Sequence, residues 1–310
     1  MRVLITGGFG FLGLITSKLL LERGYEVVMF GLNRSNNYSK FIDKCEVYSG
    51  DILNKDEVKR ACKGVDSVIH LAALDQKGCR RDPFLALKVN GFGTKNVLES
   101  AKEAGVKRFI YMSTFHVYGK PKGVVTEETK LAPLNDYAIT KLVGEYYCRQ
   151  FWDDLENIII RLCNSYGTPL GNSGQDLVLY DLCKQSIEKQ KIILRTKGRQ
   201  RRAFVGVSDV VQAIDILARA DSKDIKDNIF NVGGNDVLSI RDMAELVAQG
   251  YLELYGKKVS IEFEKDAIDE EPVDFNIDMI KIKRLGYEPK TDIKEEVKTM
   301  LKVCEDGLIG

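Results

Sequence analysis

The segment that decides the fold reads Thr6-Gly7-Gly8-Phe9-Gly10-Phe11-Leu12-Gly13. It follows the apolar run Val3-Leu4-Ile5, which predicts a buried strand, and it opens a helical pattern from Phe11 to Arg23. Glycines spaced G-x-G-x-x-G between a strand and a helix allow a tight turn and a close backbone approach to a pyrophosphate. Because this strand–helix context is present, the motif predicts a dinucleotide-binding turn rather than a plain connection.

Short apolar strands alternate with helical patterns over the first half of the chain. The expected strands after the first are residues 26–30, 45–48, 67–71, 108–112 and 157–162, and the expected helices are 54–63, 83–104 and 136–152. This alternation is typical of parallel strands joined by right-handed crossovers. It predicts an α/β fold, a Rossmann-type doubly wound parallel sheet.

The pattern changes after Leu162, where residues 166–172 form a turn-rich joint. Beyond the joint we expect helices at residues 174–189, 209–220 and 239–255 and a strand at 229–232. We therefore predict a dinucleotide-binding Rossmann domain over residues 1–165, to which segments near 204–232 return. Residues 166–310 are predicted to form mainly a smaller, mixed α/β substrate-binding lobe.

Composition excludes several classes of protein. The 46 basic and 45 acidic residues leave a net charge of +1, which argues against a general nucleic-acid binder. The seven cysteines include no C-x-x-C pair, and with only two histidines we expect no metal site. Free thiols are typical of a reducing compartment, so we expect a cytoplasmic protein. Neither a signal peptide nor an apolar run of about 20 residues is present, so no membrane span is expected.

The end of the second strand bears on the choice of cofactor. NAD enzymes usually place a carboxylate there to accept a hydrogen bond from the ribose, yet this strand ends in Gly31. Asn33, Arg34 and Ser35 follow, and Arg34 and Ser35 are suited to a 2′-phosphate. We therefore expect NAD or NADP, with NADP favoured; the alternative is that Arg34 is a solvated loop residue.

Tyr137 and Lys141 are candidates for acid–base chemistry. Spaced i and i+4 on an expected helix, they share one face. A phenol that serves as a base near neutral pH must have its pKa lowered by about 3 units, or about 4 kcal/mol. One cation at about 4 Å supplies roughly that energy at an effective dielectric of 20. The alternative is an ordinary surface pair, because Y-x-x-x-K also occurs by chance.

Hydroxyls at the end of the fifth strand complete the candidate site. Ser113 or Thr114 can hydrogen-bond a reacting oxygen there. Ligands of doubly wound sheets bind beyond the carboxyl ends of the strands, which is where these two residues are expected.

Taken together, these motifs resemble the extended short-chain dehydrogenase/reductase family, which includes nucleotide-sugar epimerases and dehydratases. The similarity covers nearly the whole chain. The motifs that carry it are the glycine turn, Gly50-Asp51-Ile52, His70-Leu71-Ala72-Ala73, Asn90…Gly93-Thr94, Ser113-Thr114…Val117-Tyr118-Gly119, Tyr137…Lys141, Arg161…Asn164-Ser165-Tyr166-Gly167, Arg202-Ala203-Phe204-Val205, Asn231-Val232-Gly233-Gly234 and Leu285-Gly286-Tyr287.

The resemblance implies roles for individual residues. It makes Tyr137 the base, Thr114 the catalytic hydroxyl and Lys141 the partner of the phenol. Cofactor contacts are implied for Gly7, Gly8, Phe9, Gly10, Phe11, Leu12, Gly13, Asp51, Ile52, Leu71, Ala72, Ala73, Asn90, Tyr137 and Lys141. Contacts to a nucleotide-diphosphate sugar are implied for Ser113, Thr114, His116, Asn164 and Arg202.

Two positions depart from the family pattern. Dehydratases of the family carry Asp-Glu after the catalytic Thr, whereas this chain has Phe115-His116, so we do not expect a dehydratase. His116 is suited to moving a proton or binding a hydroxyl, and the alternative is a packing role. Ala203 stands where the family usually has Asp, which leaves the orientation of Arg202 open.

The expected activity is NAD(P)-dependent oxidoreduction at C4 of a nucleotide-diphosphate sugar, by a 4-epimerase or a 4-dehydrogenase/4-ketoreductase. The alternative is a non-catalytic cofactor-sensing or RNA-associated protein on the same scaffold. The resemblance also implies a homodimer or a dimer-based oligomer, with the helices at 83–104 and 136–152 forming a four-helix interface.

Overall fold

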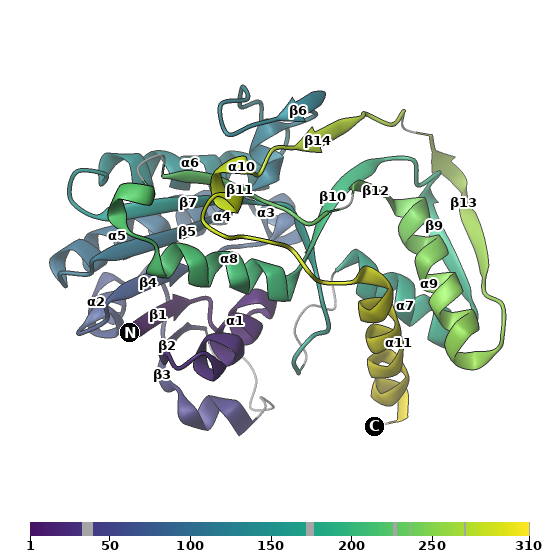
Figure 1. The fold of residues 1–310 in the computed structure, drawn as a ribbon, viewed down its shortest axis with the longest axis horizontal. Helices are drawn as coiled ribbons and strands as arrows, with labels where there is room; N and C mark the ends of the chain where they lie inside the picture. The colour runs from purple at the N-terminus through teal and green to yellow at the C-terminus, as the bar shows by residue number, and fades with distance from the viewer. Residues whose placement is uncertain (33–39, 172–176, 226–227, 236, 270, 310) are drawn as a thin grey trace.

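The computed structural model describes residues 1–310 except 33–39, 172–176, 226–227, 236, 270 and 310. Its central sheet has seven strands, all paired in parallel, in the order β11-β7-β5-β4-β1-β2-β3 (Figure 1). These strands are β1 (Arg2–Thr6), β2 (Glu26–Gly31), β3 (Glu46–Ser49), β4 (Ser67–His70), β5 (Arg108–Thr114), β7 (Glu156–Leu162) and β11 (Ile229–Val232). The predicted doubly wound parallel sheet is confirmed.

Helices cover both faces of this sheet (Figure 1). The helices α1 (Phe11–Glu22) and α8 (Val207–Arg219) pack on one face, and α2 (Lys55–Cys62), α5 (Thr94–Glu103) and α6 (Asp136–Gln150) pack on the other. Successive strand residues serve the two faces in turn, so Val3 and Ile5 join the α1 side while Leu4 joins the α2 side.

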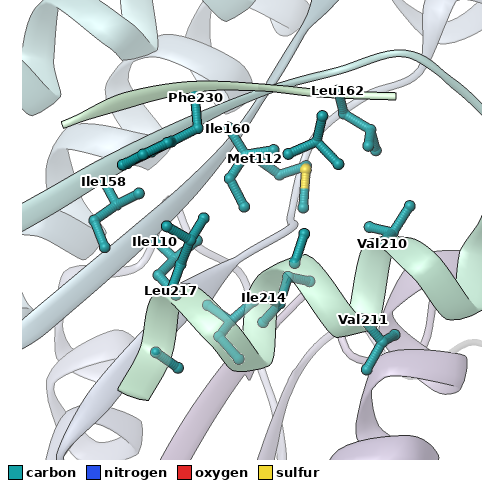
Figure 2. Packing of buried hydrophobic residues seen from close by; sticks show 14 of the residues in the cluster. Ile110, Met112, Ile158, Ile160, Leu162, Val210, Val211, Ile214, Leu217 and Phe230 are labelled. Carbon is teal, nitrogen blue, oxygen red and sulfur yellow. The ribbon is translucent and has the colours of Figure 1, made fainter. Parts of the chain in front are cut away.

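Figure 2 shows the core between the sheet and α8. Alternate residues of β5 and β7 point toward this helix, among them Ile110, Met112 and Ile160. The side of α8 that faces the sheet is a stripe of buried apolar residues, which includes Ile214 and Leu217. Burying each such side chain contributes about 1.5–3 kcal/mol. This packing holds the carboxyl end of β5 in a fixed position.

The predicted helix over residues 83–104 is confirmed, and a π-helical turn lies within it. After α3 (Gln76–Arg81) come α4 (Pro83–Ala86), a π-helical segment η2 (Leu87–Gly93) and then α5. Gly93 allows this segment to approach Ile52 closely, since a Cβ at Gly93 would lie 2.6 Å from the Ile52 Cδ1 atom. π-Helical turns are rare and are frequent at functional sites.

A second lobe lies beside the sheet (Figure 1). It contains α7 (Val178–Lys189), α9 (Ile240–Tyr255), α11 (Ile293–Ile309) and a parallel pair of strands, β9 (Lys191–Thr196) and β13 (Ser260–Ile268). The apolar core of this lobe is separate from the cores of the sheet and includes Leu182, Val247 and Leu301.

Short sheets connect the two lobes. One contains β8 (Asn164–Tyr166), β10 (Arg201–Gly206) and β12 (Val237–Ser239), and another pairs β6 (Gly123–Val125) with β14 (Phe275–Ile277). The remaining short elements are η1 (Lys40–Lys44), η3 (Phe115–Tyr118), η4 (Ser222–Asp224) and α10 (Ile280–Lys283). The helix α8 packs on the central sheet and β11 is one of its strands, although both follow β9 in the sequence. The chain therefore crosses between the lobes more than once.

Candidate functional site

The turn between β1 and α1 contains two glycines, Gly7 and Gly13, that leave no room for a side chain. Gly7 has a φ of +69°, and a Cβ there would lie 2.7 Å from the Ala72 amide nitrogen. A Cβ at Gly13 would lie 2.1 Å from the Gly7 carbonyl oxygen. Gly10, at the helix N-cap, is exposed and has no side-chain cap, and the first turn carries no acidic residue. These uncapped N–H groups fit the pyrophosphate of a dinucleotide.

The rest of the predicted cofactor turn lies close to the end of β2. The Gly8 amide donates a hydrogen bond of 3.1 Å to the Phe30 carbonyl. Phe9 is buried and contacts Gly31, whereas Phe11 and Leu12 are half-buried in the first turn of α1. The predicted contacts with the cofactor ribose fall on Asn33, Arg34 and Ser35, which lie outside the described residues.

His70 is locked into the sheet beneath this turn. Its Nδ1 lies 2.6 Å from the Thr6 hydroxyl and its Nε2 lies 3.0 Å from the Thr94 hydroxyl. Complete burial lowers the pKa of His70 well below its usual value, with a smaller contribution from the charge of Lys141. A neutral imidazole with both nitrogens engaged is suited to joining β1, β4 and α5 rather than to moving protons.

The loop after β4 passes beside the glycine turn. Leu71 and Ala72 are half-buried and Ala73 is exposed along it. Asn90 fixes this loop, because its side-chain oxygen accepts a hydrogen bond of 2.7 Å from the Leu74 amide and its nitrogen donates to the Thr140 hydroxyl at 3.0 Å. Asn90 is fully buried and positions this loop, and its contact with the cofactor stays a prediction.

Asp51 and Ile52 lie at the end of β3. The Asp51 side chain accepts a hydrogen bond of 2.9 Å from the Leu53 amide, and the Asp51 amide donates to the Glu57 carboxylate at 2.8 Å. Ile52 is buried against Gly93. The carboxylate is thus held in a local turn, at the edge where the adenine of a dinucleotide is expected.

The predicted catalytic residues come together where β5 ends and α6 begins. Asn135 caps α6 by accepting a hydrogen bond of 2.9 Å from the Ala138 amide, which fixes the first turn that carries Tyr137. The Thr114 hydroxyl hydrogen-bonds the Tyr137 phenol and accepts a weaker bond of 3.3 Å from the His116 amide. Tyr137 is half-buried, whereas Thr114 is buried.

The electrostatics of Tyr137 differ from the expectation. Burial raises its pKa to about 12, and the hydrogen bond from Thr114 offsets this only in part. The Lys141 ammonium instead lies 4.2 Å from the centre of the Tyr111 ring, and burial lowers the pKa of Lys141 to about 8. The physical reason is desolvation: both groups are removed from water, and each neutral form is favoured.

Ser113 does not join this group. Its hydroxyl donates a hydrogen bond of 2.5 Å to Glu145, two turns along α6 from Tyr137. Glu145 and Arg161 form a fully buried ion pair with an N–O distance of 2.8 Å. Because successive strand residues point to opposite faces, Ser113 faces the helix, and its expected contact with the substrate stays a prediction.

The predicted substrate residues meet beside Tyr137. The edge of the His116 ring faces the Tyr137 ring at 6.3 Å between centroids. His116 hydrogen-bonds Asn164, and the charge of Arg202 acts on it from β10. Burial and Arg202 together lower the pKa of His116 below its usual value. These residues bring η3, β8 and β10 to the same edge of the sheet as Tyr137.

Two further residues of the site were missed. Gln76 lies 3.0 Å from the His116 ring nitrogen, across 40 residues of sequence that carry no signal of this contact. Glu145 had a signal, since it follows Lys141 by four residues and therefore shares its helix face. Its partner Arg161 interrupts the apolar strand run Ile158-Ile159-Ile160, and a charge within a buried strand requires an opposite charge nearby.

Other kinds of site were sought among the described residues. No group of three or more His, Cys, Asp or Glu side chains in that part of the chain could hold a metal ion. None of the helices so described is long and apolar enough to cross a membrane.

Comparisons with known proteins agree with this geometry. Residues 3–233 match the model of the NAD dependent epimerase/dehydratase family. A protein of Bacillus subtilis described as an uncharacterized UDP-glucose epimerase is 27% identical over 95% of both chains. The UDP-glucuronic acid 4-epimerase of Bacillus cereus, solved with UDP-glucuronic acid and NAD, has a TM-score of 0.83 and 25% identity over 99% of both chains.

The UDP-glucose 4-epimerase of Thermotoga maritima, solved with UDP-glucose, has a TM-score of 0.83 and 26% identity over 99% of this chain and 100% of that one. The family match extends over most of the chain, and it begins in β1 and ends just after β11, so it spans every strand of the central sheet. This chain therefore belongs to the NAD dependent epimerase/dehydratase family and is an NAD(P)-dependent enzyme of the extended short-chain dehydrogenase/reductase type.

Proposed function

We propose that the protein oxidises and re-reduces C4 of a UDP-sugar, as a 4-epimerase. The observation that carries this proposal is the hydrogen-bonded pair Thr114–Tyr137, with Lys141 one helical turn away, at the same sheet edge as the open glycine turn. Relatives described as acting on UDP-glucose and UDP-glucuronic acid support the choice of substrate class. Phe115 and His116 in place of Asp-Glu speak against loss of water from the sugar.

In the proposed mechanism Tyr137 takes the proton of the C4 hydroxyl. The nicotinamide, when bound, supplies the acceptor for the hydride that leaves C4. Thr114 accepts a hydrogen bond from the His116 amide, so its own proton is free to stabilise the phenolate or the sugar oxygen. The pKa of Tyr137 is about 12, so the phenol would act as a base only if positive charge at a bound nicotinamide and at Lys141 lowered that pKa. Tyr137 would return the proton to the oxygen of the 4-ketone, and a bound nicotinamide would supply the hydride to its opposite face, which would give the C4 epimer.

The test uses UDP-glucose deuterated at C4. We expect UDP-galactose that retains the deuterium, with no lasting rise in the absorbance of reduced nicotinamide. Deuterium that accumulates in the reduced cofactor would instead indicate a 4-dehydrogenase. UDP-glucuronic acid, dTDP-glucose and GDP-mannose are assayed beside it, and a preference for a nucleotide other than UDP would contradict the proposed substrate class.

The finer choice of cofactor is proposed from the end of β2. Gly31 ends the strand without a carboxylate, and Arg34 and Ser35 follow in the sequence, which favours NADP. NAD is the competing choice, because the Bacillus cereus relative was solved with NAD. Dissociation constants of NAD and NADP for the protein and for Arg34→Ala decide between them. Tighter binding of NADP that is lost in the variant supports the proposal, and equal loss for both cofactors contradicts it.

We also propose a homodimer formed by the exposed faces of α4, η2 and α6. These adjacent elements carry large apolar side chains in contact with solvent, including Phe84 at 83%, Phe92 at 51% and Tyr146 at 55% exposure. Contiguous exposed apolar surface marks interfaces in soluble proteins. Light scattering is expected to give twice the chain mass, and Phe84→Glu is expected to weaken the dimer. Val124→Glu, at another exposed apolar residue, is the control.

Finally, we propose that the protein works in the cytoplasm. Its seven cysteines are all free thiols, and all but Cys45 are buried. Thiols persist in reducing compartments. Alkylation of freshly lysed cells followed by mass spectrometry is expected to label the denatured protein at all seven positions, and disulfides at any of them would contradict the assignment.

A further inference from the structure

A short chain of polar side chains beside Tyr137 joins α3 and η3 to the connecting sheet of β8 and β10. Gln76 at the start of α3 lies 3.0 Å from His116 Nε2, and His116 hydrogen-bonds Asn164 at the start of β8. Asn164 in turn donates a hydrogen bond of 3.2 Å to the Ala203 carbonyl on β10. The proposed mechanism uses none of these three side chains for proton transfer.

The partners of His116 determine its protonation. The Gln76 nitrogen can only donate, so His116 Nε2 must accept and carries no proton. The remaining proton is then expected on Nδ1, with the side-chain oxygen of Asn164 as its acceptor, since the Asn164 nitrogen donates to Ala203. All of these bonds are made at once only by the neutral Nδ1–H imidazole.

This imidazole is also tied to the proposed reacting groups. Its ring edge faces Tyr137, and its backbone amide donates to the Thr114 hydroxyl at 3.3 Å. Movement of His116 therefore affects Asn164 on one side and the Thr114–Tyr137 pair on the other.

We propose that His116 is a positioning residue for the nucleotide-sugar: its neutral imidazole, held by Gln76, fixes Asn164 and links α3 and η3 to the connecting sheet of β8 and β10 beside the substrate. Protonation places an N–H group against the Gln76 donor and breaks the link. The kinetic part of this inference rests on the proposed function, and the structural part does not.

The groups that face His116 favour the neutral form. Burial and the guanidinium of Arg202 on β10 lower its pKa, and the bond to Asn164 opposes them in part. From α6 the facing group is the neutral phenol of Tyr137. Arg161 on β7 is neutralised by Glu145 and points to Tyr118. The link is therefore present above the pKa of His116, which lies below 6.5, and is lost as the pH falls through it.

Histidine NMR tests the structural part without any substrate. The chain has two histidines, and His70 is sealed in the sheet, so the imidazole that titrates is identified by its loss in His116→Asn. We expect a titration midpoint below 6.5 and the Nδ1–H tautomer at pH 8. A midpoint at or above 6.5, or an Nε2–H tautomer, would overturn the assignment whether or not the enzyme turns over UDP-sugars.

Substitution of Gln76 tests the link directly. Gln76→Glu offers the protonated imidazole an acceptor and is expected to raise the titration midpoint of His116, whereas Gln76→Met removes the donor. The control Gln249→Glu adds the same charge on α9, at the exposed side chain that bonds Glu253, and is expected to leave the midpoint unchanged. An unchanged titration midpoint of His116 in Gln76→Glu would contradict the proposal.

Kinetics test the positioning role. In the wild type we expect KM for the nucleotide-sugar to rise on the acid side while kcat changes less. His116→Asn and Gln76→Met are expected to raise KM about tenfold, which is the effect of losing one hydrogen bond to a group that binds charge. In both variants we expect the rise of KM at low pH (the acid limb of the profile) to be absent. An acid limb that persists in His116→Asn, or a fall in kcat at constant KM, would overturn the role.

Discussion

Ser113 and Thr114 are neighbours at the end of β5, and their surroundings are opposite in character. Ser113 joins the buried pair Glu145–Arg161, in which each ionised group has its partner at hydrogen-bond distance. Thr114 joins Tyr137, where burial works against ionisation of both the phenol and the nearby Lys141. The charges on the Ser113 face of the strand end are therefore paired, whereas the ionised forms on the Thr114 face lack an ion-pair partner of opposite charge among the described residues.

This difference separates stability from activity. On the Ser113 face, Glu145 raises the pKa of Arg161 against the effect of burial, so the charged state is the stable one. On the Thr114 face, the pKa values of Lys141 and Tyr137 are displaced in the direction that burial alone dictates. Strongly perturbed groups of this kind gather at functional sites, where a ligand supplies the missing charge.

The largest effect is expected from Tyr137→Phe. Loss of the phenol removes general acid–base catalysis, so kcat is expected to fall about 10³-fold with cofactor still bound. The free energy of unfolding is expected to change by no more than about 0.5 kcal/mol. Steady-state kinetics and urea unfolding of the same preparation check both. Near-normal turnover would remove Tyr137 from the mechanism.

The opposite face is expected to respond in stability. Glu145→Ala leaves Arg161 charged and buried without its partner, which costs about 3–5 kcal/mol. Glu262→Ala, at the exposed partner of Lys191, is the matched control and is expected to cost about 1 kcal/mol or less. Urea unfolding measures both, and similar losses in the two variants would contradict the contrast between a sealed and a solvated pair.

The two hydroxyls themselves give the sharpest test of the comparison. Thr114→Val is expected to lower kcat/KM about 10- to 100-fold at nearly unchanged stability, because a hydrogen bond to a developing phenolate is lost. Ser113→Ala is expected to cost about 1 kcal/mol of stability and to change kcat/KM by less than about threefold. If Ser113→Ala impaired turnover more than Thr114→Val, the assignment of the two faces would be reversed.

The smallest effect is a gain in stability from Lys141→Met, with loss of activity. The folded state lowers the pKa of Lys141 from its usual 10.5 to about 8, so its ammonium is a cost to folding below pH 8. Removal of this charge is expected to stabilise the protein by about 1–2 kcal/mol at pH 7. The gain shrinks as the pH rises from about 8 to 10.5, where the unfolded chain also loses the proton. Thermal unfolding at pH 7 and pH 10 measures it, and a destabilised variant at pH 7 would contradict the pKa shift.

The sequence by itself determined the central sheet and the glycine turn. The sequence shows apolar alternation, helical spacing and the glycines between Gly7 and Gly13. These are properties of consecutive residues, so they can be recognised without knowledge of long-range contacts. The same holds for Tyr137 and Lys141, which one helix brings to one face. The π-helical turn within the helix over 83–104 could not be predicted, because Gly93 packs there against Ile52, which is distant in the sequence.

Only the tertiary structure decided which hydroxyl faces the site and how its groups are charged. Ser113 and Thr114 are equivalent in sequence, and their directions follow from the register of β5 against β7 and the docking of α6. The pairing of His116 with Gln76 joins residues 40 positions apart. A pKa depends on burial and on neighbours in space, so the shifts of Tyr137 and Lys141 exist only once the chain has folded.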